Sequence, residues 1–132
     1  MKQLLAACLA AMLIACTHGK TQNFPIAAIE PAEAAQVYVI RNNNLFDWGL
    51  AVEATLNGVA IAHLRAGEHI RFLVPPGLHQ IGIRESGVGA ALEQGRNYYF
   101  LISVADTPNG FEIERIDTGR GEEWLTKTRR LR

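Results

Sequence analysis

The sequence feature that most constrains the fold is the pair Asn57-Gly58, which lies between two runs of alternating polarity. A type I′ hairpin turn needs positive φ at both of its central positions, and asparagine and glycine adopt that backbone most easily. We therefore expect residues 50–56 and 59–64 to form two antiparallel strands joined by a two-residue turn. The expected register contains three pairs: Leu56 with Val59, Ala54 with Ile61, and Val52 with His63.

The same period of two continues along most of the chain between residues 36 and 116. Turns rich in glycine, proline or asparagine separate most of the runs, and no helical segment offers the crossover that neighbouring parallel strands need. The pattern predicts a mainly β fold, an antiparallel β-sandwich of about seven strands, with an up-and-down barrel as the alternative. The expected strands are residues 36–41, 50–56, 59–64, 69–74, 79–84, 97–105 and 111–116.

The alternation also predicts which face of a strand each side chain occupies. The last residues of the chain do not alternate. His69 is expected to face outward, and His63 to face the core side of its hairpin. Residues 122–132 are expected to form a short C-terminal helix that packs Trp124 and Leu125 onto the sheet. The inward-facing side chains of the strand after the hairpin are expected to be Ile70, Phe72 and Val74.

The start of the chain has the layout of a secretory signal. Lys2 supplies one positive charge, residues 4–15 are apolar or small, and the run ends in Leu13-Ile14-Ala15-Cys16. A helix of about 12 residues is about 18 Å long, whereas the hydrocarbon core of a bilayer is about 30 Å thick, so a permanent transmembrane helix is not expected. A cysteine after a small residue, with leucine three positions upstream, resembles the processing site of bacterial lipoproteins.

This resemblance implies that the bond between Ala15 and Cys16 is cleaved and that the Cys16 thiol is lipidated. Two or three acyl chains hold a protein lastingly in a lipid bilayer, where one chain would be marginal. Cys8 fits the local pattern too, but cleavage there would leave almost no apolar core upstream. An ordinary secretory signal with a chance cysteine is the alternative. Thr17 replaces the aspartate that commonly retains such proteins in the inner membrane, which favours the outer membrane, facing the periplasm.

The expected organisation is a signal peptide at residues 1–15, forming a signal helix, a lipidated cysteine with a flexible tether at 16–34, and a sandwich domain at 35–132. A short helical piece is expected around residues 33–36. Removal of the signal takes away Lys2 and leaves twelve Lys and Arg against thirteen Asp and Glu. This balance argues against a nucleic-acid partner, which would require a basic face. One cysteine remains, so no disulfide can form within the chain.

The order of four motifs resembles a known group of proteins over about residues 34–116. These motifs are the strand Ala-Gln-Val-Tyr-Val-Ile-Arg at 35–41, Leu-Asn-Gly at 56–58, Phe-Leu-Val-Pro-Pro-Gly-Leu-His at 72–79 and Gly-Arg-Asn-Tyr-Tyr-Phe at 95–100. The chain resembles a family of small bacterial lipoproteins that carry a domain of unknown function, and it is similar to PEGA-type β-sandwich modules. The resemblance implies fold and compartment, and it implies no catalytic residues.

The sequence offers no set of residues typical of an enzyme. His63, His69 and His79 are six and ten residues apart, which is no tight ligand spacing, so neither a metal nor a cofactor is expected. Ser86 lacks the flanking glycines of a nucleophile elbow, because Arg84 and Val88 occupy those positions. We therefore expect a non-catalytic protein.

Residues 85–95 read as a glycine-bearing loop and as the candidate binding loop. Its charged Glu85 and Glu93 flank the apolar Val88 and Leu92, a mixture that resembles the rim and centre of an interface. The expected function is a binding or structural module for an envelope protein or glycan; the alternative is an inhibitor or accessory subunit of an envelope enzyme. A second interpretation of the loop is a helical turn at 90–94 whose leucine caps the core.

The C-terminal residues 127–132 carry four positive charges. Such a run is typical of a solvated chain end, and it is also able to contact an anionic lipid or a partner.

Overall fold

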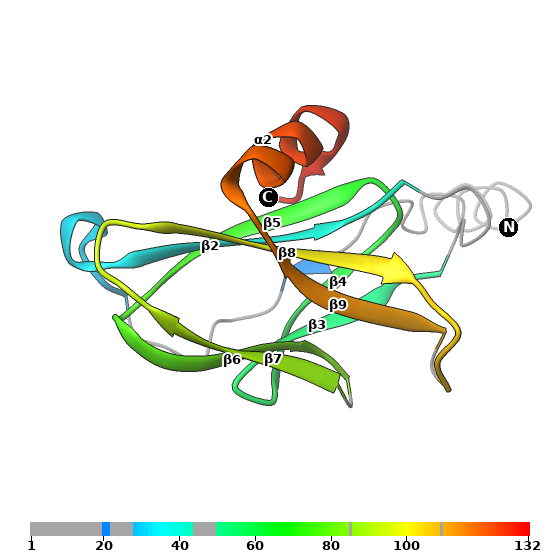
Figure 1. Cartoon of the computed structure of the whole chain (residues 1–132), viewed down its shortest axis with the longest axis horizontal. Coiled ribbons are helices and arrows are strands. Elements are labelled where there is room, and N and C mark those ends of the chain that lie inside the picture. Colours follow the sequence, from blue (N-terminus) through cyan, green and yellow to red (C-terminus); the bar gives the residue numbers. More distant parts are fainter. Residues whose placement is uncertain (1–19, 22–27, 44–49, 85, 109) are drawn as a thin grey trace, which may run out of the picture.

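The structure is a computed structural model of the chain and describes residues 20–21, 28–43, 50–84, 86–108 and 110–132. Two β-sheets pack face to face, and an α-helix covers the outer face of one of them (Figure 1). The predicted mainly β sandwich is confirmed. Among the described residues, no helix is long and apolar enough to cross a membrane.

The first sheet has the strand order β1-β4-β3-β6-β7, and its neighbouring strands are all antiparallel. The predicted hairpin forms its centre. The strands, in sheet order, are β1 (Lys20–Thr21), β4 (Val59–Leu64), β3 (Val52–Leu56), β6 (Gly77–Ile83) and β7 (Ser86–Leu92).

The second sheet has the order β10-β5-β2-β8-β9, and here the prediction of purely antiparallel pairing is wrong. Strands β2 and β8 are parallel, as are β10 and β5. The chain needs no helix to connect β2 with β8, because the intervening strands, which belong to both sheets, supply the crossover between them. The strands, in sheet order, are β10 (Arg129–Arg130), β5 (Glu68–Val74), β2 (Ala35–Arg41), β8 (Asn97–Val104) and β9 (Phe111–Ile116).

All seven predicted runs form strands, with ends that differ by a few residues. Three further strands were not predicted: β7, and the two-residue strands β1 and β10. Ser86–Leu92 was expected to be a loop, and the two short strands lie in the expected tether and the expected terminal helix.

The turn at Asn57-Gly58 is confirmed, because its φ angles are 51° and 82°. Leu56 lies opposite Val59 as expected, but the other two predicted pairs are wrong. A bulge between Ala54 and Thr55 shifts the register by one residue of β4. The pairs beyond the bulge are Ala54 with Ala62, Glu53 with His63, and Val52 with Leu64. The shift moves His63 from the core side, where it was expected, to the outer face.

The main core lies between the two sheets, and a second apolar cluster lies on the outer face of the second sheet. Ile70, Phe72 and Val74 face the main core, as predicted. The second cluster contains Ile40, Tyr99, Leu101 and Ile116. The largest fully buried aliphatic side chains are Ile40, Leu56, Ile61, Leu64, Ile70, Ile81, Ile83 and Ile102.

The helix α2 (Thr118–Lys127) covers the second cluster and packs Trp124 and Leu125 against it, as predicted. The helix begins earlier than the predicted residue 122, because Asp117 caps it by accepting a hydrogen bond from the Arg120 N–H at 2.8 Å. It also ends earlier than residue 132, and the chain continues into β10.

Parts of the predicted tether at 16–34 belong to the domain. Lys20 and Thr21 pair with His63 and Ala62 of β4 as strand β1. The short helical piece expected around 33–36 is instead the 3-10 helix η2 (Pro31–Glu33), and Ala34 after it is buried. The predicted signal helix at 1–15 lies outside the described residues.

Candidate binding surface

The predicted loop at 85–95 is wrong, because Ser86–Leu92 pairs along its whole length with β6. The helical turn expected as the alternative at 90–94 is also absent, although Leu92 does lie in the core, with 2% of its surface exposed. Val88 is partly buried against the same core. Ala15, Cys16 and Glu85 lie outside the described residues.

Glu93 follows β7 and is committed to local contacts. Its N–H donates to the hydroxyl of Tyr98 at 2.7 Å, and its carboxylate lies 2.9 Å from Nε of Arg96. Since both side chains of this ion pair are largely exposed, the pair contributes little stability. Whether Val88, Leu92 and Glu93 take part in binding stays a prediction. In the structure, Val88 and Leu92 face the main core and not solvent.

Glycines made β7 look like a loop, and the structure shows why they are needed. A Cβ atom on Gly82 of β6 would lie 2.5 Å from the carbonyl oxygen of Ser86, and one on Gly87 would lie 2.7 Å from Nε2 of Gln80. Gly82 and Gly87 lie opposite each other in the ladder; a side chain at Gly82 would meet the backbone of Ser86, whereas one at Gly87 would meet only the side chain of Gln80. The alternation of Val88, Ala90 and Leu92 is the signal that could have identified the strand.

The outer edge of β7 is, in the described part of the chain, an unpaired edge of the first sheet. β7 is the last strand of its sheet, and no described strand pairs with its other side. β9 approaches it from the second sheet without joining its ladder. Sheet edges are commonly protected by charges, prolines or bulges, yet Ser86–Leu92 contains neither a charged residue nor a proline.

The hydrogen-bond pattern determines which residues of β7 direct their backbone N–H and C=O groups toward the open side. In a hairpin with a two-residue loop, the residues that flank the loop exchange hydrogen bonds, and the pattern then alternates along the strands. Ser86 pairs with Ile83, so the backbone groups of Gly87, Gly89 and Ala91 point to the open side. Leu78 lies opposite Ala91 and is 81% exposed, which places an apolar side chain next to the edge.

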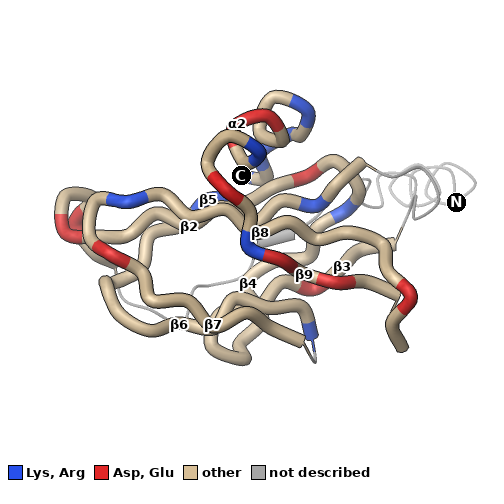
Figure 2. Tube along the Cα trace, in the orientation of Figure 1, with Lys and Arg blue, Asp and Glu red and all other residues tan. Residues whose placement is uncertain are grey.

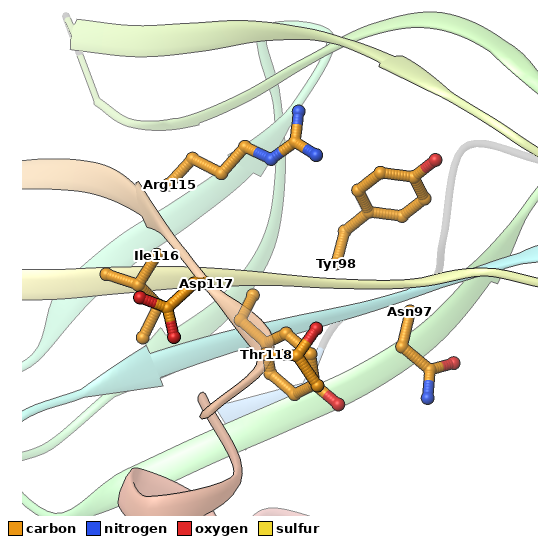
Figure 3. A pocket seen from close by; sticks show the side chains of 7 residues that line it. Asn97, Tyr98, Arg115, Ile116, Asp117 and Thr118 are labelled. Atoms are coloured by element: carbon orange, nitrogen blue, oxygen red, sulfur yellow. The ribbon is translucent and has the colours of Figure 1, made fainter. Parts of the chain in front are cut away.

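A shallow hollow of about 440 Å³ lies where β8 begins and α2 begins (Figure 3). Arg115 extends toward Tyr98, with its guanidinium carbon 5.0 Å from the ring centroid. Burial, and then the hydrogen bond to Glu122, raise the pKa of Tyr99 to about 12, so this phenol is neutral at physiological pH. The hollow is lined by Asn97, Tyr98, Tyr99, Arg115, Ile116, Asp117 and Thr118.

The polar groups around this hollow are already used by the fold. The Asp117 carboxylate caps α2, and the Tyr99 hydroxyl donates to Glu122. The hollow therefore has polar walls, and its Asp117 and Tyr99 side chains form hydrogen bonds within the fold.

A second hollow, of about 360 Å³, contains a histidine paired with a carboxylate. Nε2 of His63 lies 3.4 Å from Oε2 of Glu53, and both side chains are partly exposed. Arg84 stands beside them with a left-handed backbone, at a φ of 37°. The remaining lining residues are Ala51, Val52, Ile83 and Phe111, none of which is a nucleophile.

The other two histidines have separate surroundings. His69 lies on the outer face of its sheet, as expected, but it is only 7% exposed, because the C-terminal segment covers it and its Nδ1 lies 2.7 Å from Oγ1 of Thr128. His79 contacts Asn57 and the carbonyl of Pro75. Among the described residues, no three His, Cys, Asp or Glu side chains are grouped to hold a metal ion.

Two fully buried charges were not identified from the sequence. Arg41 donates to the carbonyl oxygens of Leu50 and Leu64, and its guanidinium lies 5.0 Å from the ring centroid of Phe111. Glu68 is 1% exposed and lies 3.0 Å from Nη2 of Arg129, which ties β10 to β5. The inward alternation of β2 was a usable signal for Arg41.

Comparison with known proteins provides little more. Neither a family model nor a curated protein matches the chain. Among solved structures, the N-terminal domain of AlgF from P. aeruginosa is similar, with a TM-score of 0.42 and 13% identity. The match covers 67% of this chain and 100% of that one, and at this TM-score it supports no conclusion about function.

Proposed function

We propose that this protein is a lipid-anchored, non-catalytic binding module of the bacterial cell envelope. The sequence Leu13-Ile14-Ala15-Cys16 supports an anchor at Cys16, and Thr17 favours the outer membrane, facing the periplasm. The resemblance to small lipoproteins and PEGA-type modules agrees with this compartment. The observation that carries the binding role is the open, uncharged edge of β7.

The partner that fits this edge best is an extended segment of another protein. A segment that adds to the sheet gains hydrogen bonds from the outward backbone groups of Gly87, Gly89 and Ala91. The small side chains of this strand let a partner approach, and exposed Leu78 supplies an apolar contact. A glycan would find fewer matching groups here, because Ser86–Leu92 has neither aromatic nor charged side chains.

The binding role can be tested by site-specific photocrosslinking in living cells. A photoreactive residue in place of Ala91 should give a discrete protein adduct, and Gly89→Pro should abolish it by removing an outward N–H. A Cβ atom at Gly89 meets no atom within 4 Å, so this position has room for a side chain. The same photoreactive residue at Val59, which is exposed on another strand, is the control.

The absence of an adduct at residue 91, or an adduct that persists in Gly89→Pro, would contradict binding through this edge. The anchor is tested separately by palmitate labelling of the wild type, Cys8→Ser and Cys16→Ser. Only Cys16→Ser should lose the label, and labelling that survives in this variant would refute the anchor.

A further inference from the structure

We propose that the β1/β10 side of the sandwich faces the membrane, where basic residues of the C-terminal segment contact anionic phospholipid headgroups. This orientation presents the β7 edge away from the bilayer. The inference rests on the proposed anchor at Cys16, and it adds a second contact with the lipid surface and a defined orientation.

The topology places the two ends of the domain on the same side. The sheets pack with β4 next to β5 and with β7 next to β9. β1 is the edge strand beyond β4, and β10 is the edge strand beyond β5. The N-terminal and C-terminal strands therefore share one side of the sandwich, and β7 and β9 form the opposite side.

The chain length then brings the β1 side close to the bilayer. Lys20, the first residue of β1, follows Cys16 by four residues, which span at most about 14 Å when extended. β7 lies four strands from β1 in the same sheet, or about 19 Å at the usual strand spacing. A lipid on Cys16 thus holds β1 near the headgroups, and the far edge can lie well above them.

The C-terminal segment carries its basic side chains on this side. Leu131 packs against the main core, and its N–H donates to the carbonyl of His69 at 2.8 Å, so the segment is held on β5. Alternation then directs Arg130 and Arg132 to the face opposite Leu131, and both are exposed. Within the described part of the chain, neither of these arginines forms an ion pair, whereas Arg129 is paired with Glu68.

Among the residues that the structure describes, the opposite side has no comparable run of unpaired basic side chains. β9 exposes Glu112 and Glu114 together with Arg115, β7 itself carries no charge, and Arg96 near its end is paired with Glu93. Figure 2 shows both acidic and basic positions along β9, and basic positions near the C-terminus. A basic residue near an anionic membrane shifts a binding equilibrium by about fivefold, so Arg130 and Arg132 together would favour the proposed orientation by about 25-fold.

The orientation can be measured on the full lipidated protein in vesicles of phosphatidylethanolamine with or without phosphatidylglycerol. With Cys16 acylated, a cysteine introduced at Thr126 or at Gly89 is the free thiol of the mature chain and can carry a donor fluorophore. Energy transfer to an acceptor on the headgroups should be stronger from residue 126 than from residue 89. This difference should require phosphatidylglycerol and shrink in 1 M salt, where the screening length is about 3 Å.

The double variant Arg130→Glu/Arg132→Glu should remove most of the difference. The matched control, Arg84→Glu/Arg96→Glu, reverses the same number of exposed charges at the two ends of β7 and should retain it. Equal transfer from both labels, or a difference insensitive to phosphatidylglycerol and to the double variant, would overturn the orientation while leaving the anchor intact. Failure of the wild-type protein to float with the vesicles would overturn the anchor, and the orientation with it.

Discussion

Replacement of Gly121 by alanine should separate α2 from the sheet that it covers. A Cβ atom at this position would lie 2.2 Å from Cγ of Tyr99, far inside the usual carbon–carbon contact of about 3.5 to 4.0 Å. The ring has little freedom to move away. It stacks on Tyr38 with 5.1 Å between ring centroids, and its hydroxyl is bound to Glu122. The helix backbone must therefore shift by more than about 1 Å.

The expected loss of stability follows from two opposing contributions. Overpacking typically costs about 1 to 3 kcal/mol, and the confined ring at Tyr99 places Gly121→Ala near the upper end. Alanine is a better helix former than glycine by about 1 kcal/mol, which offsets part of the cost. We expect the free energy of unfolding to fall by about 2 kcal/mol, which lowers Tm by about 10 °C in a domain of this size.

Gly119→Ala in the same helix is the matched control, because a Cβ atom there meets only a side-chain oxygen, Oδ1 of Asp117, at 3.3 Å, and a shift of a few tenths of an ångström relieves this contact. This variant should be as stable as the wild type or slightly more stable. Urea unfolding of a soluble form that begins at Thr17 would measure both variants. If Gly121→Ala were as stable as Gly119→Ala, the close packing of α2 on Tyr99 would be refuted.

Two further variants test the C-terminal contact and the hairpin. Burial, and then Arg130, lower the pKa of His69 below its usual 6.5. The folded domain therefore binds this proton less readily than the unfolded chain, and stability should decline as the pH falls below about 6.5. In His69→Gln, the free energy of unfolding measured by urea titration should depend less on pH below about 6.5. An unchanged dependence on pH would contradict the role of His69 protonation. Gly58→Val should cost about 1 to 2 kcal/mol in thermal unfolding, because Gly58 has a φ of 82°, and Gly58→Asn should cost much less.

The sequence predicted the features that depend on local side-chain patterns. The alternation identified seven strands and the inward side chains of β5, since a strand with one buried face must be apolar at every second position. The turn at Asn57-Gly58 was predictable because its positive φ angles restrict the residue types. Trp124 and Leu125 marked the helix that covers the second sheet, because large apolar side chains need a surface to pack against.

Apart from the β3–β4 hairpin, the sequence did not predict which strands are neighbours. An alternation with a period of two indicates which side chains share a face of the sheet, but it does not indicate which strand lies alongside. The parallel pair of β2 and β8 joins Gln36 to Asn97 across most of the domain, and the intervening strands belong to both sheets. The bulge in the β3–β4 hairpin could not be predicted either. Ile61 and Ala62 are both apolar and both buried, so the sequence does not show which of them lies opposite Ala54. An extra residue in one strand changed the face of every residue beyond it, including His63.

The edge of β7 was missed for a reason that bears on function. The residues of this strand are mostly small, and small residues with glycines resemble a loop in the sequence. Gly87 and Gly89 therefore suggested flexibility, although both lie in a strand that pairs with β6 along its whole length. A search for acids, bases and nucleophiles passes over such a surface, because its donors and acceptors belong to the main chain. The proposed binding role of β7 therefore depends on its backbone groups, and it is tested by the variants that alter this edge.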